Sequence, residues 1–332
     1  MLPFFMSDYN SLTNILNDIG AAVSSGDFDT AMSLYLIVFQ SHGGYLSPPS
    51  GSELTKEQST HIHNAANLAR RAFFIASQHI GSTPRVKSAV KMLTGEEKKV
   101  FQSSDQQPSF FYIPNLPSTP FAKIESVKGL DKWVEQISKY NTDFSKCIAN
   151  ANERYVEVIG EVPNHKDWIA LSKNWNSLHL MKGGHFTEYA EQLPEEVKRL
   201  FMSDLLAHCP SHAPEVVLSV LQPKTKIPPH FGISNIKWTL HIPLQVNNSC
   251  YLEVAGKREY WNESVDALLF DDSFVHGAEN PSDVARAVLI IDIWNPFLEE
   301  CERSDIKELM SIYGDWSEIY GALAVLDKRF YK

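Results

Sequence analysis

Short runs in the second half of the chain alternate between apolar and polar residues. The clearest run spans 236–244, where Lys237, Thr239 and His241 fall on one face and apolar residues fall on the other. A period of two indicates a β-strand with one buried face and one polar face. We expect further strands at 215–222, 250–254, 258–261, 267–271 and 285–293. Many short strands separated by turn residues predict a two-sheet jelly roll, with the polar face of the 236–244 strand lining its cavity.

The first third of the chain has a helical period instead. Between residues 8 and 102, apolar residues recur three or four positions apart, which predicts helices. Segment 26–31 resembles one tetratricopeptide-type helical hairpin, although a single unit cannot bury its own apolar face. A charged and polar stretch at 96–107 follows. We therefore expect a helical N-terminal region over 1–105 and a second domain over 106–332.

Helical spacing also occurs on both sides of the strand-rich part. It predicts helices over 126–157, 194–208 and the tail 299–332. The expected fold class is therefore α+β, with a jelly-roll core, flanking helices and an N-terminal helical region.

Composition narrows the functional classes. With 332 residues, 43% of them hydrophobic, the chain has the composition of a globular protein. Its net charge of −10 disfavours a phosphate backbone as partner, so we expect no nucleic-acid binding. No apolar run reaches the roughly 18 residues that span a bilayer, and the start shows no signal-peptide pattern. Four dispersed cysteines without a CxxC pair fit a reducing compartment, so a cytoplasmic location is expected.

Two histidines in the strand-rich part carry the candidate chemistry. His230 follows a lysine- and proline-rich turn at 224–229, and His276 ends an apolar strand. Either one alone would more often be a packing or surface residue. Two imidazoles in neighbouring strands of one β unit favour a metal site. Imidazole suits iron, zinc, copper and nickel, so these ligands alone leave the metal open.

Arg286 lies in an otherwise apolar strand, where an unpaired charge would be costly. One explanation is a structural salt bridge to Asp292 or Asp272. The other is that the guanidinium binds a carboxylate of a small ligand, an interaction that its planar fork suits. Ser219 could then add a hydroxyl donor to the same carboxylate. His241 could contact the other end of that ligand, or it could be a hydrogen-bonded cavity histidine.

Four blocks of sequence add a specific resemblance. They are 111–117 with 120–121, 228–232 with Asn235, 261–263 leading to 270–276, and Arg286 with 291–296. Through these blocks the chain resembles the aspartyl/asparaginyl β-hydroxylase family of iron(II)- and 2-oxoglutarate-dependent dioxygenases. The resemblance implies a double-stranded β-helix, the cupin-like jelly roll. It also implies hydroxylation of an unactivated C–H with dioxygen, coupled to decarboxylation of 2-oxoglutarate to succinate and CO2.

The same resemblance implies roles for individual residues. His230 and His276 match the iron ligands of the family. Arg286 and Ser219 match the groups that bind the distal carboxylate of 2-oxoglutarate. His241 matches a further contact to that cosubstrate.

Three positions bear on the metal and the substrate. Gly232 stands where most 2-oxoglutarate oxygenases place an aspartate or glutamate ligand, a lack that some members of this family share. The animal peptidyl hydroxylase of the family holds an acidic substrate with two arginines, and the matching positions here are Lys237 and Thr239. Loss of one charge weakens the case for peptidyl aspartate. A free amino acid, another peptide residue or a lipid acyl chain stays open as substrate.

The sequence leaves two alternatives to this enzyme open. The first is a non-catalytic β-barrel binding protein that kept the fold, because a ligand carboxylate is missing and the N-terminal helices would suit a protein partner. The second is a hydrolytic zinc site, which needs three protein ligands and a general base. Asp271 and Asp272 could serve as ligands, but the sequence does not place them. The dioxygenase, with a small-molecule or peptide substrate, is the stronger hypothesis.

Overall fold

The computed structural model describes most of the chain after residue 79. The described residues are 80–94, 96–108, 110–150, 156–157, 171, 174–210, 212–261 and 267–320, with scattered positions between 17 and 34. Most of the predicted N-terminal helical region, including most of its tetratricopeptide-like segment, lies outside the described residues.

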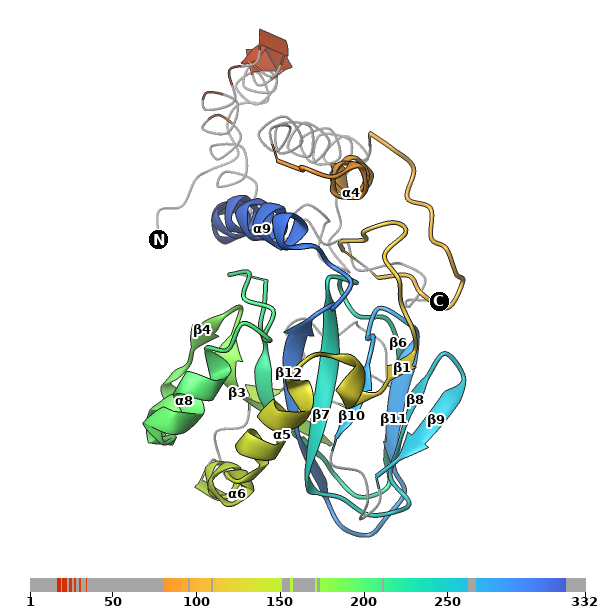
Figure 1. The fold of residues 1–332 in the computed structure, drawn as a ribbon, viewed down its shortest axis with the longest axis vertical. Helices are drawn as coiled ribbons and strands as arrows, with labels where there is room; N and C mark the ends of the chain where they lie inside the picture. The colour runs from red at the N-terminus through yellow and green to blue at the C-terminus, as the bar shows by residue number, and fades with distance from the viewer. Residues whose placement is uncertain are drawn as a thin grey trace, which may run out of the picture.

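Two antiparallel sheets face each other across the second half of the chain (Figure 1). Their strands are β1 Phe121–Ala122, β2 Val156–Glu157, β3 Trp175–Lys182, β4 His185–Phe186, β5 Val216–Leu221, β6 Thr225–His230, β7 Lys237–Gln245, β8 Tyr251–Val254, β9 Lys257–Tyr260, β10 Leu268–Phe270, β11 His276–Asn280 and β12 Arg286–Trp294. The large sheet has the order β1-β10-β7-β12-β5-β3-β2, and β4 pairs with β3. The small sheet has the order β6-β11-β8-β9.

The consecutive strands from β5 to β12 wind as a jelly roll. Strands β5, β12, β7 and β10 are neighbours in the large sheet, whereas β6, β11, β8 and β9 form the small sheet. Every connection except the β8–β9 hairpin therefore crosses from one sheet to the other. This winding is the double-stranded β-helix, so the predicted α+β fold with a jelly-roll core and flanking helices is confirmed.

Strand β7 shows why the sequence folds in this way. Its apolar residues Trp238, Leu240 and Ile242 belong to a core cluster with the helices outside the large sheet. The intervening polar residues point to the cavity between the sheets, as the alternation predicted. A second apolar cluster fills the rest of the space between the sheets. The buried outer face fixes the register, because a slip of one residue would exchange the two faces.

Helices α5 Leu130–Ser138, α6 Asn141–Asn150 and α8 Glu195–Phe201 cover the outer face of the large sheet (Figure 1). The single helix predicted over 126–157 is wrong. The chain turns between α5 and α6, so that Trp133 and Phe144 both reach the sheet, and its end pairs with β3 as strand β2.

The helix predicted over 194–208 ends early, at the end of α8. After α8, Trp294 donates its backbone N–H to the carbonyl of Leu205, and Ala207 donates its N–H to that of Asp292. These bonds to strand β12 compete with continuation of the helix. Two short 3-10 helices, η1 Ile124–Ser126 and η2 Glu188–Gln192, complete this layer.

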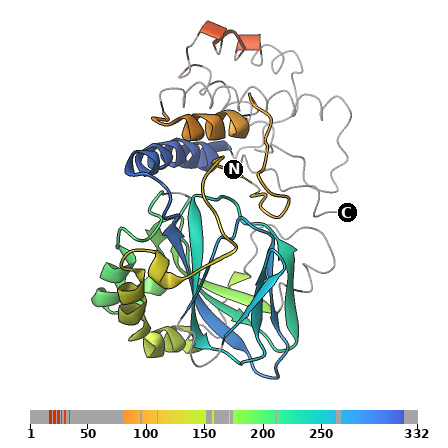
Figure 2. The same cartoon turned by 45° about the vertical axis from the view of Figure 1, so that its right-hand side comes forward.

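Helices α4 Pro84–Thr94 and α9 Glu300–Tyr320 lie side by side at one end of the sandwich (Figure 2). The Arg85 guanidinium pairs with the Glu302 carboxylate, and Ser82 donates to Asp305. The predicted C-terminal helix is confirmed as far as it is described. The division near residue 105 stays a prediction.

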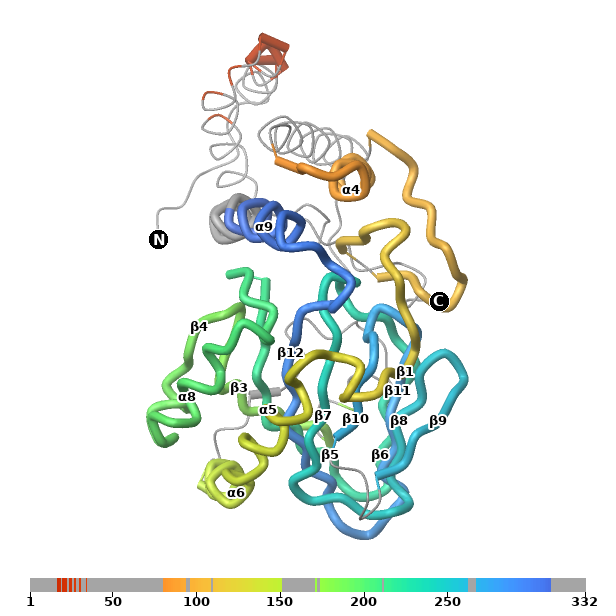
Figure 3. The backbone as a smooth tube through the Cα atoms, viewed as in Figure 1, coloured from red at the N-terminus to blue at the C-terminus, as the bar shows by residue number. Residues whose placement is uncertain are grey.

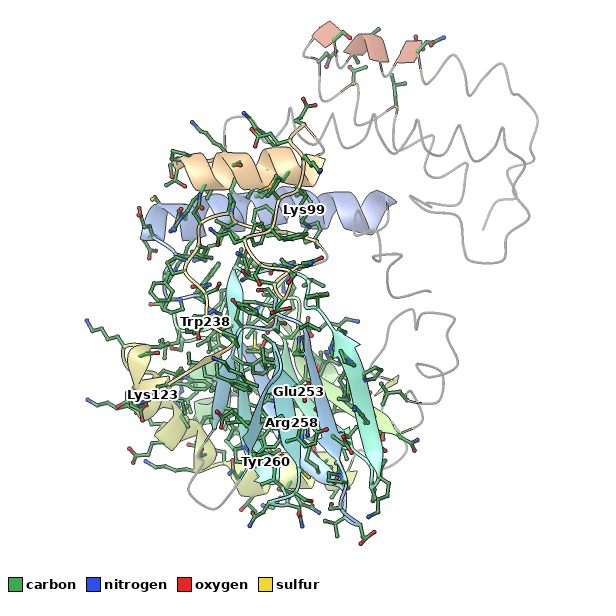
Figure 4. The ribbon with its side chains drawn as sticks, turned by 90° about the vertical axis from the view of Figure 1, so that its right-hand side faces the viewer. Lys99, Lys123, Trp238, Glu253, Arg258 and Tyr260 are labelled. Atoms are coloured by element: carbon green, nitrogen blue, oxygen red, sulfur yellow. The ribbon has the colours of Figure 1, made fainter. Side chains whose placement is uncertain are left out.

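The backbone path after α4 also returns to the jelly roll. Figure 3 shows it running past the end of the sandwich before β1. There the Gln106 amide donates to the Asp271 carboxylate and the Ser273 hydroxyl. Figure 4 labels Trp238 near the end of the sandwich that faces α9, where its ring meets Phe297 at 6.0 Å between centroids. Within the described part of the chain, no helix is long and apolar enough to cross a membrane.

Candidate functional site

The two sheets enclose an open cavity of about 1130 Å³. It is lined by every site residue predicted from the sequence: Ser219, His230, Lys237, Thr239, His241, His276 and Arg286. Small-molecule sites commonly occupy about 300–1,000 Å³, so this cavity has room for more than one small ligand.

The histidine pair lies where strands β6 and β11 meet. His230 and His276 are register partners, with ring centroids 4.1 Å apart. The sequence predicted a turn at 224–229, but residues 225–229 lie in strand β6. Prolines are tolerated there because β6 is an edge strand of the small sheet. His276 was predicted to end a strand, and instead it begins β11 after a turn.

Backbone carbonyls fix the orientation of both imidazoles. Nδ1 of His230 lies 2.9 Å from the Pro228 oxygen, and Nδ1 of His276 lies 2.9 Å from the Phe274 oxygen. A carbonyl can only accept, so each Nδ1–H donates and each Nε2 keeps its lone pair. Burial lowers the pKa of His230 to about 3 and that of His276 to about 4. Both rings are therefore neutral at physiological pH, as a metal ligand must be.

A third protein ligand is missing from the described residues, among which no group of three His, Cys, Asp or Glu side chains could hold a metal ion. Gly232 shows why a carboxylate does not stand there. A Cβ at this position would lie 2.6 Å from Cγ and Oδ2 of Asp272 and 2.8 Å from the Asp272 carbonyl oxygen. The close approach also gives a hydrogen bond from the Gly232 N–H to that oxygen, 2.7 Å long.

Arg286 is buried without a carboxylate partner among the described residues. Its Nη2 has no hydrogen-bond partner, and its Cζ lies 4.5 Å from the centroid of the Trp261 ring. Burial lowers the pKa of Arg286 to about 10, so it stays charged at neutral pH. The structural salt bridge to Asp292 or Asp272 is not formed, and both carboxylates bind Lys237 instead. A buried cation with an unused donor favours an anionic ligand.

Ser219 lies on β5, the strand that pairs with the Arg286 strand. Its Oγ accepts a hydrogen bond of 2.9 Å from Nε1 of Trp175. An indole N–H can only donate, so the serine proton is available to a ligand. Sequence reasoning missed Trp175 because strand β3 was not predicted. The alternation of Ser177 and His179 with Leu178 and Leu180 is the signal that could have found this strand.

His241 lies between two aromatic side chains. Its ring meets Phe270 edge-on at 4.9 Å and lies almost parallel to Trp261, at 7° and 6.2 Å between centroids. Its Nδ1 is buried without a partner. Burial, with the nearby Arg286 charge, lowers the pKa of His241 well below its ordinary value. A neutral ring with a free nitrogen can therefore bond to a ligand beside Arg286.

Lys237 is enclosed by two carboxylates. Its Nζ lies 3.0 Å from Oδ2 of Asp272 and 2.7 Å from Oδ1 of Asp292. Burial opposes the charge on Lys237, but the two carboxylates outweigh it and raise its pKa. Burial raises the pKa of Asp292 to about 6 despite the lysine. Next along the polar face, Oγ1 of Thr239 is buried without a partner.

Comparison with known proteins decides the family. The family model for aspartyl/asparaginyl β-hydroxylase matches residues 136–296, which include the jelly roll from β5 to β12. Residues 136–296 therefore belong to the aspartyl/asparaginyl β-hydroxylase family. The cavity lies in the hydroxylase domain of that family.

Related proteins of the aspartyl/asparaginyl β-hydroxylase family are distant in sequence. Human aspartate β-hydroxylase domain-containing protein 2 is 28% identical over 207 residues, covering 60% of this chain and 54% of the relative. Mouse aspartate β-hydroxylase domain-containing protein 1 is 25% identical over 205 residues, covering 60% and 54%. Human aspartyl/asparaginyl β-hydroxylase is 29% identical over 96 residues, covering 29% and 12%. The chain thus spans about half the length of the first two relatives.

Solved structures with some likeness to this hydroxylase-family chain include oxygenases. A Pseudomonas putida prolyl-4-hydroxylase aligns with a TM-score of 0.31 and 11% identity, covering 48% of this chain and 86% of that one. An oxidoreductase of the 2OG-Fe(II) oxygenase family from Burkholderia pseudomallei aligns with a TM-score of 0.26 and 11% identity, covering 46% and 90%. The jelly-roll assignment rests on the strand order, since these scores are low.

We expect that placing a carboxylate at Gly232 will not strengthen metal binding by this member of the family. Gly232→Ala and Gly232→Asp should each lower the free energy of unfolding by about 1–3 kcal/mol, because the added Cβ overlaps Asp272. Urea unfolding measures this loss, and a cobalt(II) titration measures metal affinity. Gly20→Ala is the matched control, because a Cβ at Gly20 meets nothing within 4 Å. Tighter metal binding by Gly232→Asp would contradict the steric argument.

Proposed function

We propose that this protein is an iron(II)- and 2-oxoglutarate-dependent dioxygenase that hydroxylates an unactivated C–H of an amino acid, peptide or related small substrate. One observation carries the proposal. A buried arginine without a carboxylate partner, Arg286, lines the same cavity as a pair of neutral, carbonyl-anchored histidines. A site that offers metal ligands together with an unused anion site suits a metal that works with an anionic cosubstrate.

The residues present fit both groups. His230 and His276 would hold iron through their Nε2 atoms, and solvent or cosubstrate oxygens would complete the coordination. Arg286 and Ser219 would bind the distal carboxylate of 2-oxoglutarate, with His241 as a further contact. When bound, iron(II), 2-oxoglutarate and dioxygen supply the oxidising power, through decarboxylation to succinate and CO2.

The chain's own contribution is orientation and exclusion of water. The bonds from Nδ1 to backbone carbonyls keep both imidazoles in one tautomer and one direction. Trp261 supports the Arg286 guanidinium with its ring and stacks on His241, so its indole holds both side chains in position. A site held in position before its ligand arrives loses less entropy on binding.

The alternatives make different predictions about metal and cosubstrate. A hydrolytic zinc enzyme needs a third protein ligand, which the described residues do not supply. A non-catalytic member that kept only the fold would bind neither iron nor 2-oxoglutarate. A cytoplasmic location and a protein partner for the N-terminal helices stay as proposals from the sequence.

An anaerobic titration tests the proposed function. Iron(II) added to the purified protein with 2-oxoglutarate should give a metal-to-ligand charge-transfer band, and air should then release succinate slowly even without substrate. The same protein without 2-oxoglutarate is the control. If no band forms and no succinate appears, the dioxygenase proposal fails and the non-catalytic binding protein is favoured.

Arg286→Lys should weaken 2-oxoglutarate binding by about 100-fold or more while metal affinity changes little. Lysine keeps the charge but not the planar fork that bonds a carboxylate twice. The titration of 2-oxoglutarate against the charge-transfer band measures the first effect, and a cobalt(II) titration measures the second. Arg258→Lys, on the exposed β8–β9 hairpin labelled in Figure 4, is the control. Equal 2-oxoglutarate affinity in Arg286→Lys and wild type would rule out this role.

A further inference from the structure

The substrate side of the cavity holds more negative charge than positive charge. Lys237 faces it, but its ammonium is shared between Asp272 at 3.0 Å and Asp292 at 2.7 Å. With both carboxylates ionised, this group of three side chains has a net charge of −1. Lys237 therefore offers little attraction to an incoming carboxylate, although it is the one cation that strand β7 points into the cavity.

Unused polar atoms lie beside that group. The Thr239 side chain is 5% exposed, lines the cavity, and its Oγ1 has no hydrogen-bond partner. Oδ1 of Asp272 is also buried without a partner and belongs to a residue that lines the same cavity. A buried carboxylate oxygen can only accept hydrogen bonds, and leaving it unpaired is costly. The Asp272 oxygen therefore calls for a ligand that donates, and the Thr239 hydroxyl can accept a hydrogen bond from the same ligand.

Other charged groups around the cavity do not reverse this balance. Glu215 lines it and is bonded to His179 at 2.7 Å and to the Gly183 N–H at 2.7 Å. Arg286 is the cation that the proposed function assigns to 2-oxoglutarate. Lys182 lies at the exposed end of β3, at the rim.

We propose that the substrate carries a cationic nitrogen group, an ammonium or guanidinium, close to the carbon that reacts, and that a carboxylate in its place is rejected. This inference rests on the proposed dioxygenase function, because it concerns the substrate of the same site. A cation donates to Asp272 and Thr239 and is attracted by the net negative charge. A carboxylate at the same place meets repulsion that the low-dielectric cavity screens poorly.

A matched set of peptides tests the preference. The peptides have blocked ends and differ only at a central residue, which is lysine, arginine, glutamine or aspartate. Isothermal calorimetry with the anaerobic iron(II)–2-oxoglutarate protein measures their affinities, and mass spectrometry after exposure to air locates added oxygen. The lysine or arginine peptide should bind at least about tenfold more tightly than the aspartate peptide, and added salt should reduce the difference.

Substitutions at Thr239 link the preference to this surface. Thr239→Arg adds a cation and should shift the preference toward the aspartate peptide. Thr239→Val removes the hydroxyl without adding charge, so it should weaken all peptides modestly and keep their order. Asp272→Asn should reduce affinity for the basic peptides more than for glutamine. If it weakens every peptide equally, Asp272 does not read substrate charge and the proposal is overturned.

Failure of this inference can be told apart from failure of the proposed function. A charge-transfer band together with equal or tighter binding of the aspartate peptide overturns the substrate class alone. Absence of the band overturns the dioxygenase itself, and the calorimetric order of the peptides is still measured on the same protein. Absence of binding by both basic peptides also overturns the substrate class.

Discussion

His276→Ala should abolish iron-dependent succinate formation and lower metal affinity by more than about 100-fold. The reason is the small ligand set: only His230 would remain as a protein ligand among the described residues. Sites with three protein ligands can lose one and still hold metal weakly, whereas this site would keep a single imidazole. His230→Ala should give the same result, because the two rings face each other at 4.1 Å between centroids.

Metal affinity should be measured by cobalt(II) titration, and activity by succinate release. His185→Ala is the control, since His185 is exposed on β4 and does not line the cavity. Circular dichroism and urea unfolding should show that the His276→Ala protein remains folded, because the His276 ring lines an open cavity and its removal leaves no closed void. Wild-type metal affinity in His276→Ala would show that the metal binds elsewhere.

Lys237→Met should lower the free energy of unfolding by about 3–5 kcal/mol at pH 8. Methionine has a similar length but leaves Asp272 and Asp292 buried without their cation. The loss should be smaller at pH 5. Burial already raises the pKa of Asp292 to about 6, and removal of the lysine raises it further. When folding raises the pKa of a carboxyl group, the folded state loses stability as the pH rises through that pKa. The reason is that the same carboxyl ionises freely in the unfolded chain.

Urea unfolding at pH 5 and pH 8 measures both parts of this prediction. Lys226→Met is the control: Lys226 is 62% exposed and lies 3.9 Å from Glu279, so its loss should change stability by less than about 1 kcal/mol. A Lys237→Met protein as stable as wild type at pH 8 would mean that Asp272 and Asp292 do not depend on the buried ammonium. The same result would remove the charge balance on which the substrate class was inferred.

Sequence reasoning performed best where one face of a strand is buried. The alternation along β7 predicted which side chains point into the cavity. Successive side chains of a strand point to opposite faces, so the apolar residues identify the buried face and the polar residues the other. It performed worst for elements whose conformation depends on pairing. Strand β6 contains two prolines, and its sequence predicted a turn. The short strand β2 was predicted as the end of a helix.

The candidate site divides in the same way. His230, His276 and Arg286 could be named as site residues from the sequence, together with the chemistry that imidazole and guanidinium permit. The partners of these groups could not. Both Asp292 and Asp272 were plausible partners for Arg286, and only the packed strands show that Lys237 takes both. Trp175 and Trp261 beside the anion site emerged from the structure as well.

By itself the sequence determined the jelly-roll fold, the two candidate metal ligands and the absence of a carboxylate at Gly232. The fold and the ligand candidates follow from local periodicity and residue chemistry, whereas the meaning of Gly232 follows from the family resemblance. None of them needs knowledge of distant contacts. The tertiary structure alone decided how the charges pair, which buried atoms have no partner, and why a side chain at Gly232 has no room. Those properties depend on distances between residues far apart in the chain, and such distances exist only once the two sheets have packed.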